Sequence, residues 1–468
     1  MFQTPEFFFL LIISALLYWM LPQGRLLILG IASAIFYGWA GTGYLALFFL
    51  MAAATYLCSW RLEATGKRGW FLFGLFLNLG NLIFFKYALF LLREITGLTG
   101  LVLVPPGSIM GQLVLPVGIS FYTFQLMAYL TDVYRGEIKV PGFLRFWVFI
   151  SFFAQLIAGP IMRGRDFLPQ IEKIEKITFD KDLTAIKWGV FWITLGLVKK
   201  VVLADTISPL VDWHFDRAAW IYGFQSWLGA YLFGFQIYLD FSGYSDMAIG
   251  LGKLFGLAMT RNFHTPYLSL NPSEFWRRWH VTLSSWVRDY IYIPLGGSRR
   301  GEAKRSRNLI LAMTICGFWH GAAWTYLFWG FYHGVVLVLY HQFQRHSRKR
   351  EFKNIPPILT VFLTFQVITI GWVFFRAETL TEAWIYLSHM FQNFNIYQLI
   401  FNKKALFPVL LLFLFHLWED RFLKNHPHWV ERWRKLPAPM RGLGYFLIMV
   451  LILAYLTQGQ QSFIYFRF

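Results

Sequence analysis

The chain alternates between long apolar stretches and shorter segments rich in polar or charged residues. A helix needs roughly 20 apolar residues to cross the hydrocarbon of a membrane, where only backbone with internal hydrogen bonds is tolerated. Stretches that fit such helices are 7–21, 26–41, 43–60, 70–92, 113–130, 143–162, 187–210, 222–240, 308–340, 357–375, 405–418 and 442–457. Several are short or interrupted by glycine, so the pattern predicts an all-α integral membrane protein with about 10–11 transmembrane helices and additional re-entrant segments.

The longer polar stretches are 61–69, 163–187, 261–307, 341–356 and 419–441. In 163–187, isoleucine and leucine recur every three or so residues among glutamate and lysine, which predicts an interfacial helix. The sequence contains neither an internal repeat nor a linker long enough to separate domains. We therefore expect residues 1–468 to form a single integral-membrane unit.

Composition supports a bilayer environment. Apolar residues make up 57% of the chain and aromatic residues 20%, whereas only 14% are charged, which excludes a disordered chain and an ordinary soluble enzyme. The 43 Lys and Arg against 24 Asp and Glu give a net charge of +19. Membrane proteins gather such excess in cytoplasmic loops, so we expect the lipid bilayer and not nucleic acid as the partner. Cys58 and Cys316 both lie in apolar stretches, so no metal site is expected.

A helix start is predicted within the polar stretch 261–307. In Asn271-Pro272-Ser273-Glu274, Asn271 can accept from the first helix amides, Pro272 fits the first helical position, and Glu274 can bond back. We expect one helix to continue from there, with His280 at the edge of an apolar face formed by Phe275, Trp276, Trp279, Leu283 and Trp286.

Basic residues flank the apolar stretch 308–340 on both sides. If both basic clusters are cytoplasmic, the chain between them must enter the membrane and return. Its 33 residues are too few for two full crossings of about 20 each, which favours two short helices that turn near 317–321 and place His320 deep. A single tilted span with one cluster outside is the alternative.

Two histidines and two carboxylates are candidates for chemistry. A neutral imidazole in a low-dielectric site can act as a general base, so His320 is the first candidate and His280 the second, although either can be a hydrogen-bonded core residue. Asp240 and Asp246 lie beside an apolar span, where carboxylates are costly. A structural ion pair with Arg277, Arg278 or Arg288 is favoured for them over catalysis.

Several motifs occur in one order over roughly residues 113–340, about half the chain. They are Leu115 to Gln125 (LPVGISFYTFQ), Ala158 to Ile161 (AGPI), Asp240 to Asp246 (DFSGYSD), Phe275 to His280 (FWRRWH), Arg288 to Gly297 (RDYIYIPLGG) and Gly317 to Gly321 (GFWHG). Together they resemble the membrane-bound O-acyltransferase family. The resemblance is to the bacterial branch that contains the membrane subunit of alginate O-acetyltransferase, with the teichoic-acid D-alanylation subunit as a relative.

The resemblance implies that His320 is the catalytic histidine and His280 a second active-site histidine, with Asn271, Trp319, Asp240 and Asp246 as candidates for shaping the site. It implies helices around a central funnel or tunnel, in which a cytoplasmic donor meets an extracytoplasmic acceptor. The donor is expected to be an acyl thioester, acetyl coenzyme A or an acyl carrier protein, with no bound cofactor. An extracytoplasmic esterase-like acetyltransferase is the expected partner, and the bacterial cytoplasmic (inner) membrane the expected location.

The last six residues, Phe463 to Phe468, look like the terminal motif of envelope acyl-transfer systems, in which a tyrosine carries the acyl group. A phenol with a pKa of about 10 forms an ester that leaves readily, so an acyl group on Tyr465 could be passed on. An aromatic anchor at the membrane interface is the alternative. For the whole protein, acetyl transfer to an extracytoplasmic polysaccharide is the first hypothesis. D-alanyl transfer toward teichoic acid, a transporter or channel, and a scaffold are the others.

Overall fold

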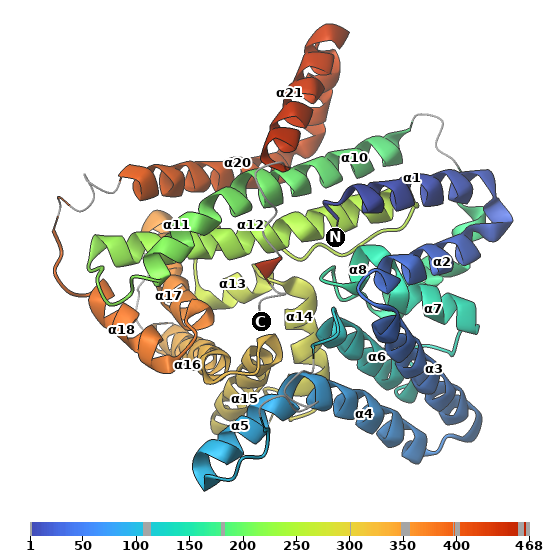
Figure 1. Cartoon of the computed structure of the whole chain (residues 1–468), viewed down its shortest axis with the longest axis horizontal. Coiled ribbons are helices and arrows are strands. Elements are labelled where there is room, and N and C mark those ends of the chain that lie inside the picture. Colours follow the sequence, from blue (N-terminus) through green and yellow to red (C-terminus); the bar gives the residue numbers. More distant parts are fainter. Residues whose placement is uncertain are drawn as a thin grey trace. The chain divides into compact units, whose positions relative to one another are not determined.

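The computed structural model describes residues 2–105, 114–178, 183–299, 301–347, 356–395, 397, 403–456 and 463–464. All regular secondary structure in these ranges is helical (Figure 1). The chain divides into two compact units that alternate along the sequence, Met1–Leu195 with Tyr244–Arg261, and Gly196–Gly243 with Asn262–Phe468. Neither unit is continuous in sequence, and one functional unit over 1–468 stays a prediction.

The first unit contains the N-terminal helices. They are α1 (Pro5–Met20), α2 (Arg25–Gly38), α3 (Thr42–Thr65), α4 (Arg68–Leu82), α5 (Ala88–Thr99), α6 (Ile119–Tyr134), α7 (Phe143–Ser151), α8 (Phe153–Leu156), α9 (Gly164–Glu172) and most of α10 (Thr184–Leu197). A π-helical segment, Ile83–Tyr87, joins α4 to α5. Buried tyrosines tie distant segments together: the Tyr18 hydroxyl donates to the Phe255 carbonyl and that of Tyr37 to Val117, both at 2.7 Å.

The prediction of one interfacial helix over 163–187 is wrong. The short helix α9 ends at Glu172, a 3-10 turn covers Ile174–Lys176, and α10 begins only at Thr184. The buried Arg25 guanidinium donates to the carbonyls of Ile174 at 3.0 Å and Ile177 at 2.6 Å. Because these carbonyls accept hydrogen bonds from Arg25, they are not available for the backbone hydrogen bonds of a continuous helix.

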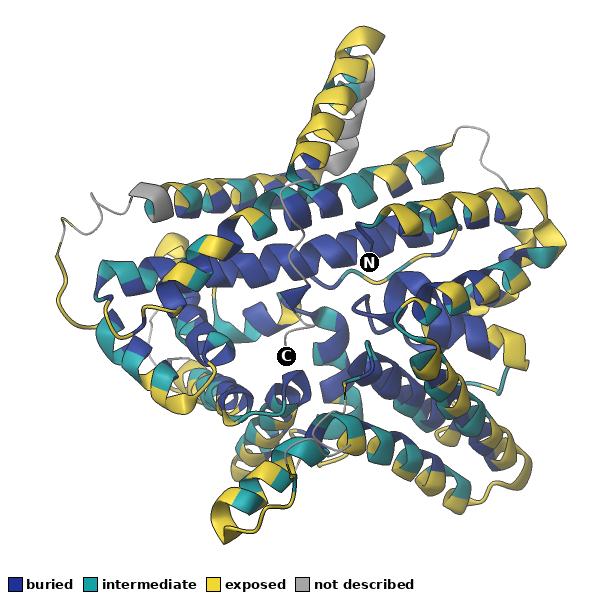
Figure 2. Ribbon diagram, viewed as in Figure 1, coloured by how far each residue is buried: buried dark blue, intermediate teal, exposed yellow. Residues whose placement is uncertain are grey.

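The second unit begins with the π-helical segment η5 (Val198–Ala204) and holds the remaining helices. They are α11 (Asp205–Phe215), the first part of α12 (Phe224–Leu254), α13 (Pro272–Arg278), α14 (Val281–Val287), α15 (Glu302–His320), α16 (Trp324–Ser347), α17 (Pro357–Arg376), α18 (Leu380–Met390), α20 (Lys403–Lys435) and α21 (Ala438–Leu456). Helix α12 is buried along almost all of its length (Figure 2).

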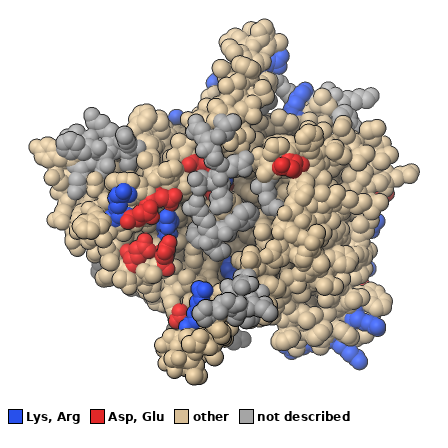
Figure 3. Space-filling view, in the orientation of Figure 1, with Lys and Arg blue, Asp and Glu red and all other residues tan. Residues whose placement is uncertain are grey.

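The outer surface has the character expected next to lipid. Four helices among the described residues are long and apolar enough to span a membrane: Thr42–Thr65, Arg68–Thr99, Pro357–Arg376 and Ala438–Leu456. The last of these, α21, is exposed along nearly its whole length although it is apolar (Figure 2). On the face drawn in Figure 3, charged side chains form small groups between wide uncharged areas. The number of ten or eleven crossings stays a prediction.

Candidate active site

His320 is the last residue of α15, at the closed end of a helical hairpin. Helix α15 covers Glu302–His320, three residues form the turn, and α16 runs back over Trp324–Ser347. The predicted reversal of the chain near 317–321 is confirmed, and the alternative of a single span is wrong. The helices are longer than expected, with 19 and 24 residues, because each includes part of its basic flank.

Glycines allow the two helices of the hairpin to pack closely. A Cβ atom on Gly317 would lie 2.8 Å from the Gly330 Cα, and one on Gly334 would lie 2.8 Å from the Ile310 Cα. A Cβ on Gly321 would overlap the Tyr326 ring. The glycines on both sides of His320 are therefore needed to hold it against α16.

Aromatic rings surround His320 on several sides. Its exposed fraction is 3%, and its ring centroid lies 5.0 Å from that of Trp319 and 5.2 Å from those of Trp329 and Phe375. His320 is also the C-terminal residue of the 19-residue helix α15.

His280 lies at a break between two short helices. The predicted start is confirmed: Asn271 Oδ1 accepts from the Glu274 amide at 2.9 Å, and Glu274 Oε2 accepts from the Leu270 amide at 2.9 Å. The expectation of one continuous helix is wrong. Helix α13 ends at Arg278, His280 has φ of 39° and ψ of 56°, and α14 begins at Val281.

Residues 262–264 explain the break at His280. The His264 amide donates to the Arg278 carbonyl at 2.9 Å, and the Val281 amide donates to the Asn262 carbonyl at 3.0 Å. These groups would otherwise bond within a continuous helix. The left-handed backbone of a non-glycine residue costs about 1–3 kcal/mol, and such positions often occur at functional sites.

The structure brings the two predicted histidines into one cluster. The His280 side chain is fully buried, and its ring centroid lies 6.2 Å from that of Trp319, the neighbour of His320. The His280 ring also packs against Phe241 of α12, at 4.6 Å. We call His280, Trp319, His320 and Trp329 the histidine cluster. Aromatic rings therefore enclose both histidines.

A third buried histidine was missed in the sequence. The His333 side chain of α16 is fully buried, with its ring centroid 4.9 Å from that of Trp329 and 5.2 Å from that of Trp276. A Cβ on Gly371 would lie 2.6 Å from its Nε2 atom. The signal was present, because an ionisable residue inside a long apolar stretch is rare in membrane proteins.

Asp240 forms the expected kind of contact with an unexpected partner. Its Oδ1 atom lies 2.8 Å from Lys200 Nζ, which is also 2.8 Å from Asp205 Oδ1. The predicted arginine partners bind carboxylates closer in sequence, Arg278 with Glu274 and Arg288 with Asp289.

The neighbouring motif residues have separate places. A Cβ on Gly243 would lie 2.7 Å from the Gly196 carbonyl oxygen. The absence of a side chain at Gly243 therefore allows the backbone that leads into η5 to pack closely against α12. Asp246 is buried and belongs to the first unit. Tyr465 lies outside the described residues.

A second buried ionic network joins η5 to α20. Lys199 Nζ donates to Glu419 Oε1, and the Tyr238 hydroxyl donates to Glu419 Oε2 at 2.6 Å. His416 Nδ1 lies 3.5 Å from the same Oε2 atom. Lys199 and Lys200 were not among the predicted site residues, although two lysines in the apolar stretch 187–210 indicate buried ion pairs.

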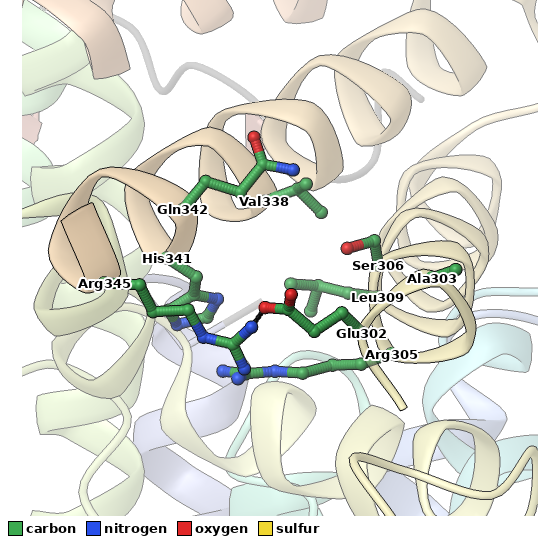
Figure 4. A pocket seen from close by; sticks show the side chains of 9 residues that line it. All are labelled: Glu302, Ala303, Arg305, Ser306, Leu309, Val338, His341, Gln342 and Arg345. Carbon is green, nitrogen blue, oxygen red and sulfur yellow. Dashed lines mark ion pairs between the residues drawn. The ribbon is translucent and has the colours of Figure 1, made fainter. Parts of the chain in front are cut away.

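A basic pocket lies at the open end of the α15–α16 hairpin, opposite the end that carries His320. Its volume is about 230 Å³, and it is lined by Glu302, Ala303, Arg305, Ser306, Leu309, Val338, His341, Gln342 and Arg345 (Figure 4). Arg345 is paired with Glu302, whereas Arg305 has no carboxylate partner among the described residues. Burial, and then the charges of Arg305 and Arg277, lower the pKa of His341. The pocket is therefore electropositive and suited to an anion.

Comparison with known proteins identifies the family. Residues 35–377 match the model of the membrane-bound O-acyltransferase family, a range that includes all three buried histidines near α15 and α16. The chain belongs to this family. Membership makes the protein a multi-pass membrane O-acyltransferase, and the sequence resemblance to the family is thereby confirmed.

The relatives of this O-acyltransferase are named for different polymers. A probable alginate O-acetylase of Azotobacter vinelandii is 39% identical over 83% of this chain and 78% of its own length. A peptidoglycan O-acetyltransferase of Helicobacter pylori is 38% identical over 82% of this chain and 78% of its own. A teichoic acid D-alanyltransferase of Streptococcus thermophilus is 29% identical over 57% of this chain and 69% of its own length.

Proposed function

We propose that this O-acyltransferase takes an acetyl group from a cytoplasmic thioester and passes it across the bacterial inner membrane for O-acetylation of an extracytoplasmic polysaccharide. The donor is acetyl coenzyme A or an acyl carrier protein, and an esterase-like partner places the group on the polymer. The observation that carries the proposal is His320 at the end of α15, in one buried cluster with His280. Relatives named for O-acetylation at 38–39% identity favour acetyl over D-alanyl.

In the proposed step, neutral His320 takes the proton of the attacking hydroxyl, that of Tyr465. The oxygen attacks the thioester carbonyl carbon, the carbon–sulfur bond breaks, and the departing thiolate receives the proton from His320. The products are acetyl-Tyr465 and a free thiol. His280 would stabilise negative charge on the carbonyl oxygen. The aromatic rings exclude water, which would otherwise hydrolyse the thioester.

The two ends of the hairpin fit a donor that enters from the cytoplasm. Helix α15 has 19 residues and therefore extends about 28 Å, from the basic pocket to His320. Excess Lys and Arg mark cytoplasmic segments, so the pocket belongs to that side in the proposed topology. There it would hold the phosphates of coenzyme A, while the thioester reaches toward His320 through a central tunnel.

We predict that Arg305→Ala raises KM for acetyl coenzyme A about tenfold and leaves kcat within about twofold, because a phosphate contact is lost and the chemistry is not touched. Steady-state kinetics of the purified protein measures both constants. Acetyl-pantetheine, which lacks the nucleotide phosphates, should be insensitive to the substitution. Lys304→Ala is the matched control, since Lys304 belongs to the same basic cluster but does not line the pocket. An equal effect on both substrates would contradict donor binding there.

The acyl relay is tested by incubating the purified protein with isotope-labelled acetyl coenzyme A and analysing its C-terminal peptide by mass spectrometry. We expect label on wild-type protein and none on Tyr465→Phe, because phenylalanine lacks the hydroxyl that forms the ester. An acetyl-loaded carrier protein is tested in parallel. Absence of label in wild type with both donors would refute the relay. If label appeared only with a carrier protein loaded with D-alanine, the transferred group would be D-alanyl and not acetyl.

A further inference from the structure

The C-terminal residues Phe463 and Ile464 are held inside the second unit by α12. Each is only 5% exposed. The Ile464 amide donates to Asp240 Oδ2 at 2.7 Å, across 224 positions of sequence. The Phe463 ring packs edge-on against Phe241, with centroids 5.8 Å apart. Two consecutive residues of α12 therefore hold two consecutive residues of the chain end.

The carboxylate of Asp240 is itself fixed. Its two oxygens have different partners: Oδ1 receives Lys200 and Oδ2 receives the Ile464 amide. Asp240 is 2% exposed and Lys200 4%, so both charges lie in the interior. A buried carboxylate accepts short, strong hydrogen bonds, and removal of one partner leaves an unmet charge. The chain end is thus one of the groups that satisfy this carboxylate.

The same part of α12 also contacts the histidine cluster. Phe241, which packs against Phe463, lies 4.6 Å from the His280 ring. Residue 465 directly follows Ile464, so the contact with Asp240 fixes the backbone one residue before the tyrosine. The contact is to a main-chain amide, so it depends on the presence of an N–H group at position 464 and not on the side chain there.

We infer that Asp240, oriented by Lys200, is a positioning residue that clamps the C-terminal segment beside the histidine cluster through the amide of Ile464. The clamp is a property of the fold. Its consequence, that Tyr465 is presented for acylation, rests on the proposed function.

The clamp is tested without any donor, by the accessibility of position 463. Phe463→Cys is introduced with Cys58→Ala and Cys316→Ala, which remove the native thiols, and the rate of maleimide labelling is measured in detergent. Adding Asp240→Ala should accelerate labelling about 10- to 100-fold, because a hydrogen bond to a buried charged group is lost. Asp205→Asn is the matched control: Asp205 also binds Lys200, whereas the Ile464 amide donates to Asp240, so we expect a change within about twofold.

Proline at position 464 provides a second, independent test of the clamp. Ile464→Pro removes the donor N–H and leaves the ionic network intact, so labelling should rise as it does for Asp240→Ala. Ile464→Val keeps both the amide and the β-branched shape and should match the parent. If Asp240→Ala does not fold, the comparison of Ile464→Pro with Ile464→Val tests the clamp by itself. Labelling as slow in Ile464→Pro as in Ile464→Val would overturn the clamp.

Acylation then separates the clamp from the relay. With labelled acetyl coenzyme A, Ile464→Pro should lower label on the C-terminal peptide about tenfold, while Ile464→Val should leave it unchanged. If the clamp variants react faster with maleimide but no acyl label appears even in wild type, the clamp is supported and the acyl relay through Tyr465 is refuted. Unchanged acyl label in Ile464→Pro with a released segment would refute the positioning role.

Discussion

His320→Ala should lower acetyl transfer by about 10³-fold, because in the proposed function the substitution removes the general base that accepts the proton of the attacking hydroxyl. Truncation also removes three ring contacts, so some loss of stability is expected in addition. His320→Gln retains more of the volume and serves as the isosteric variant. The measurement is the single-turnover rate of label transfer from acetyl coenzyme A, normalised to protein that elutes as a single species in detergent.

His333→Gln is the matched control for that experiment. His333 is as deeply buried as His320 and contacts the same Trp329 ring, at 4.9 Å against 5.2 Å. It does not end a helix, however, and α16 continues for more than three turns beyond it. We therefore expect the rate of His333→Gln to stay within about tenfold of wild type. Equal losses in the two variants would show that the cluster tolerates no change of packing, and His320 would lose its special role.

The local features of the site could be predicted from the sequence. The Asn271 cap is confirmed because its hydrogen bonds span only a few residues and follow from residue type alone. The reversal after His320 is confirmed because the distribution of basic residues and the length of 308–340 constrain the path of the chain. The grouping of His280 with His320 needed the family resemblance, because no local pattern shows that the Trp319 ring of α15 lies near His280.

The features that could not be predicted depend on partners far away in sequence. The break at His280 arises because residues 262–264 bind the Arg278 carbonyl and the Val281 amide, and no propensity of His280 itself indicates a left-handed backbone. The partner of Asp240 was predicted among nearby arginines. The structure instead uses Lys200, 40 positions earlier, because local acids already neutralise two of those arginines. Buried charges in sequence predict that a partner exists, but only the fold identifies it.

The pair Lys199 and Glu419 provides the second large expected effect, on stability. Both side chains are 1% exposed, and they connect η5 to α20. Removing one member leaves a buried charge without its main partner, which costs about 3–5 kcal/mol. We therefore expect Lys199→Met and Glu419→Gln each to lower the apparent midpoint of thermal unfolding by roughly 5 °C or more, as measured by tryptophan fluorescence in detergent.

The double variant distinguishes an ion pair from two independent contributions. Replacing both members removes the charges together, and such replacements are often neutral or stabilising. Lys199→Met with Glu419→Gln should therefore recover most of the lost midpoint, although Tyr238 and His416 then bind an amide instead of a carboxylate. A midpoint equal to the sum of the two single losses would contradict the pairing. Lys187→Met, at an exposed position of α10, should change the midpoint by less than about 1 °C in the same assay.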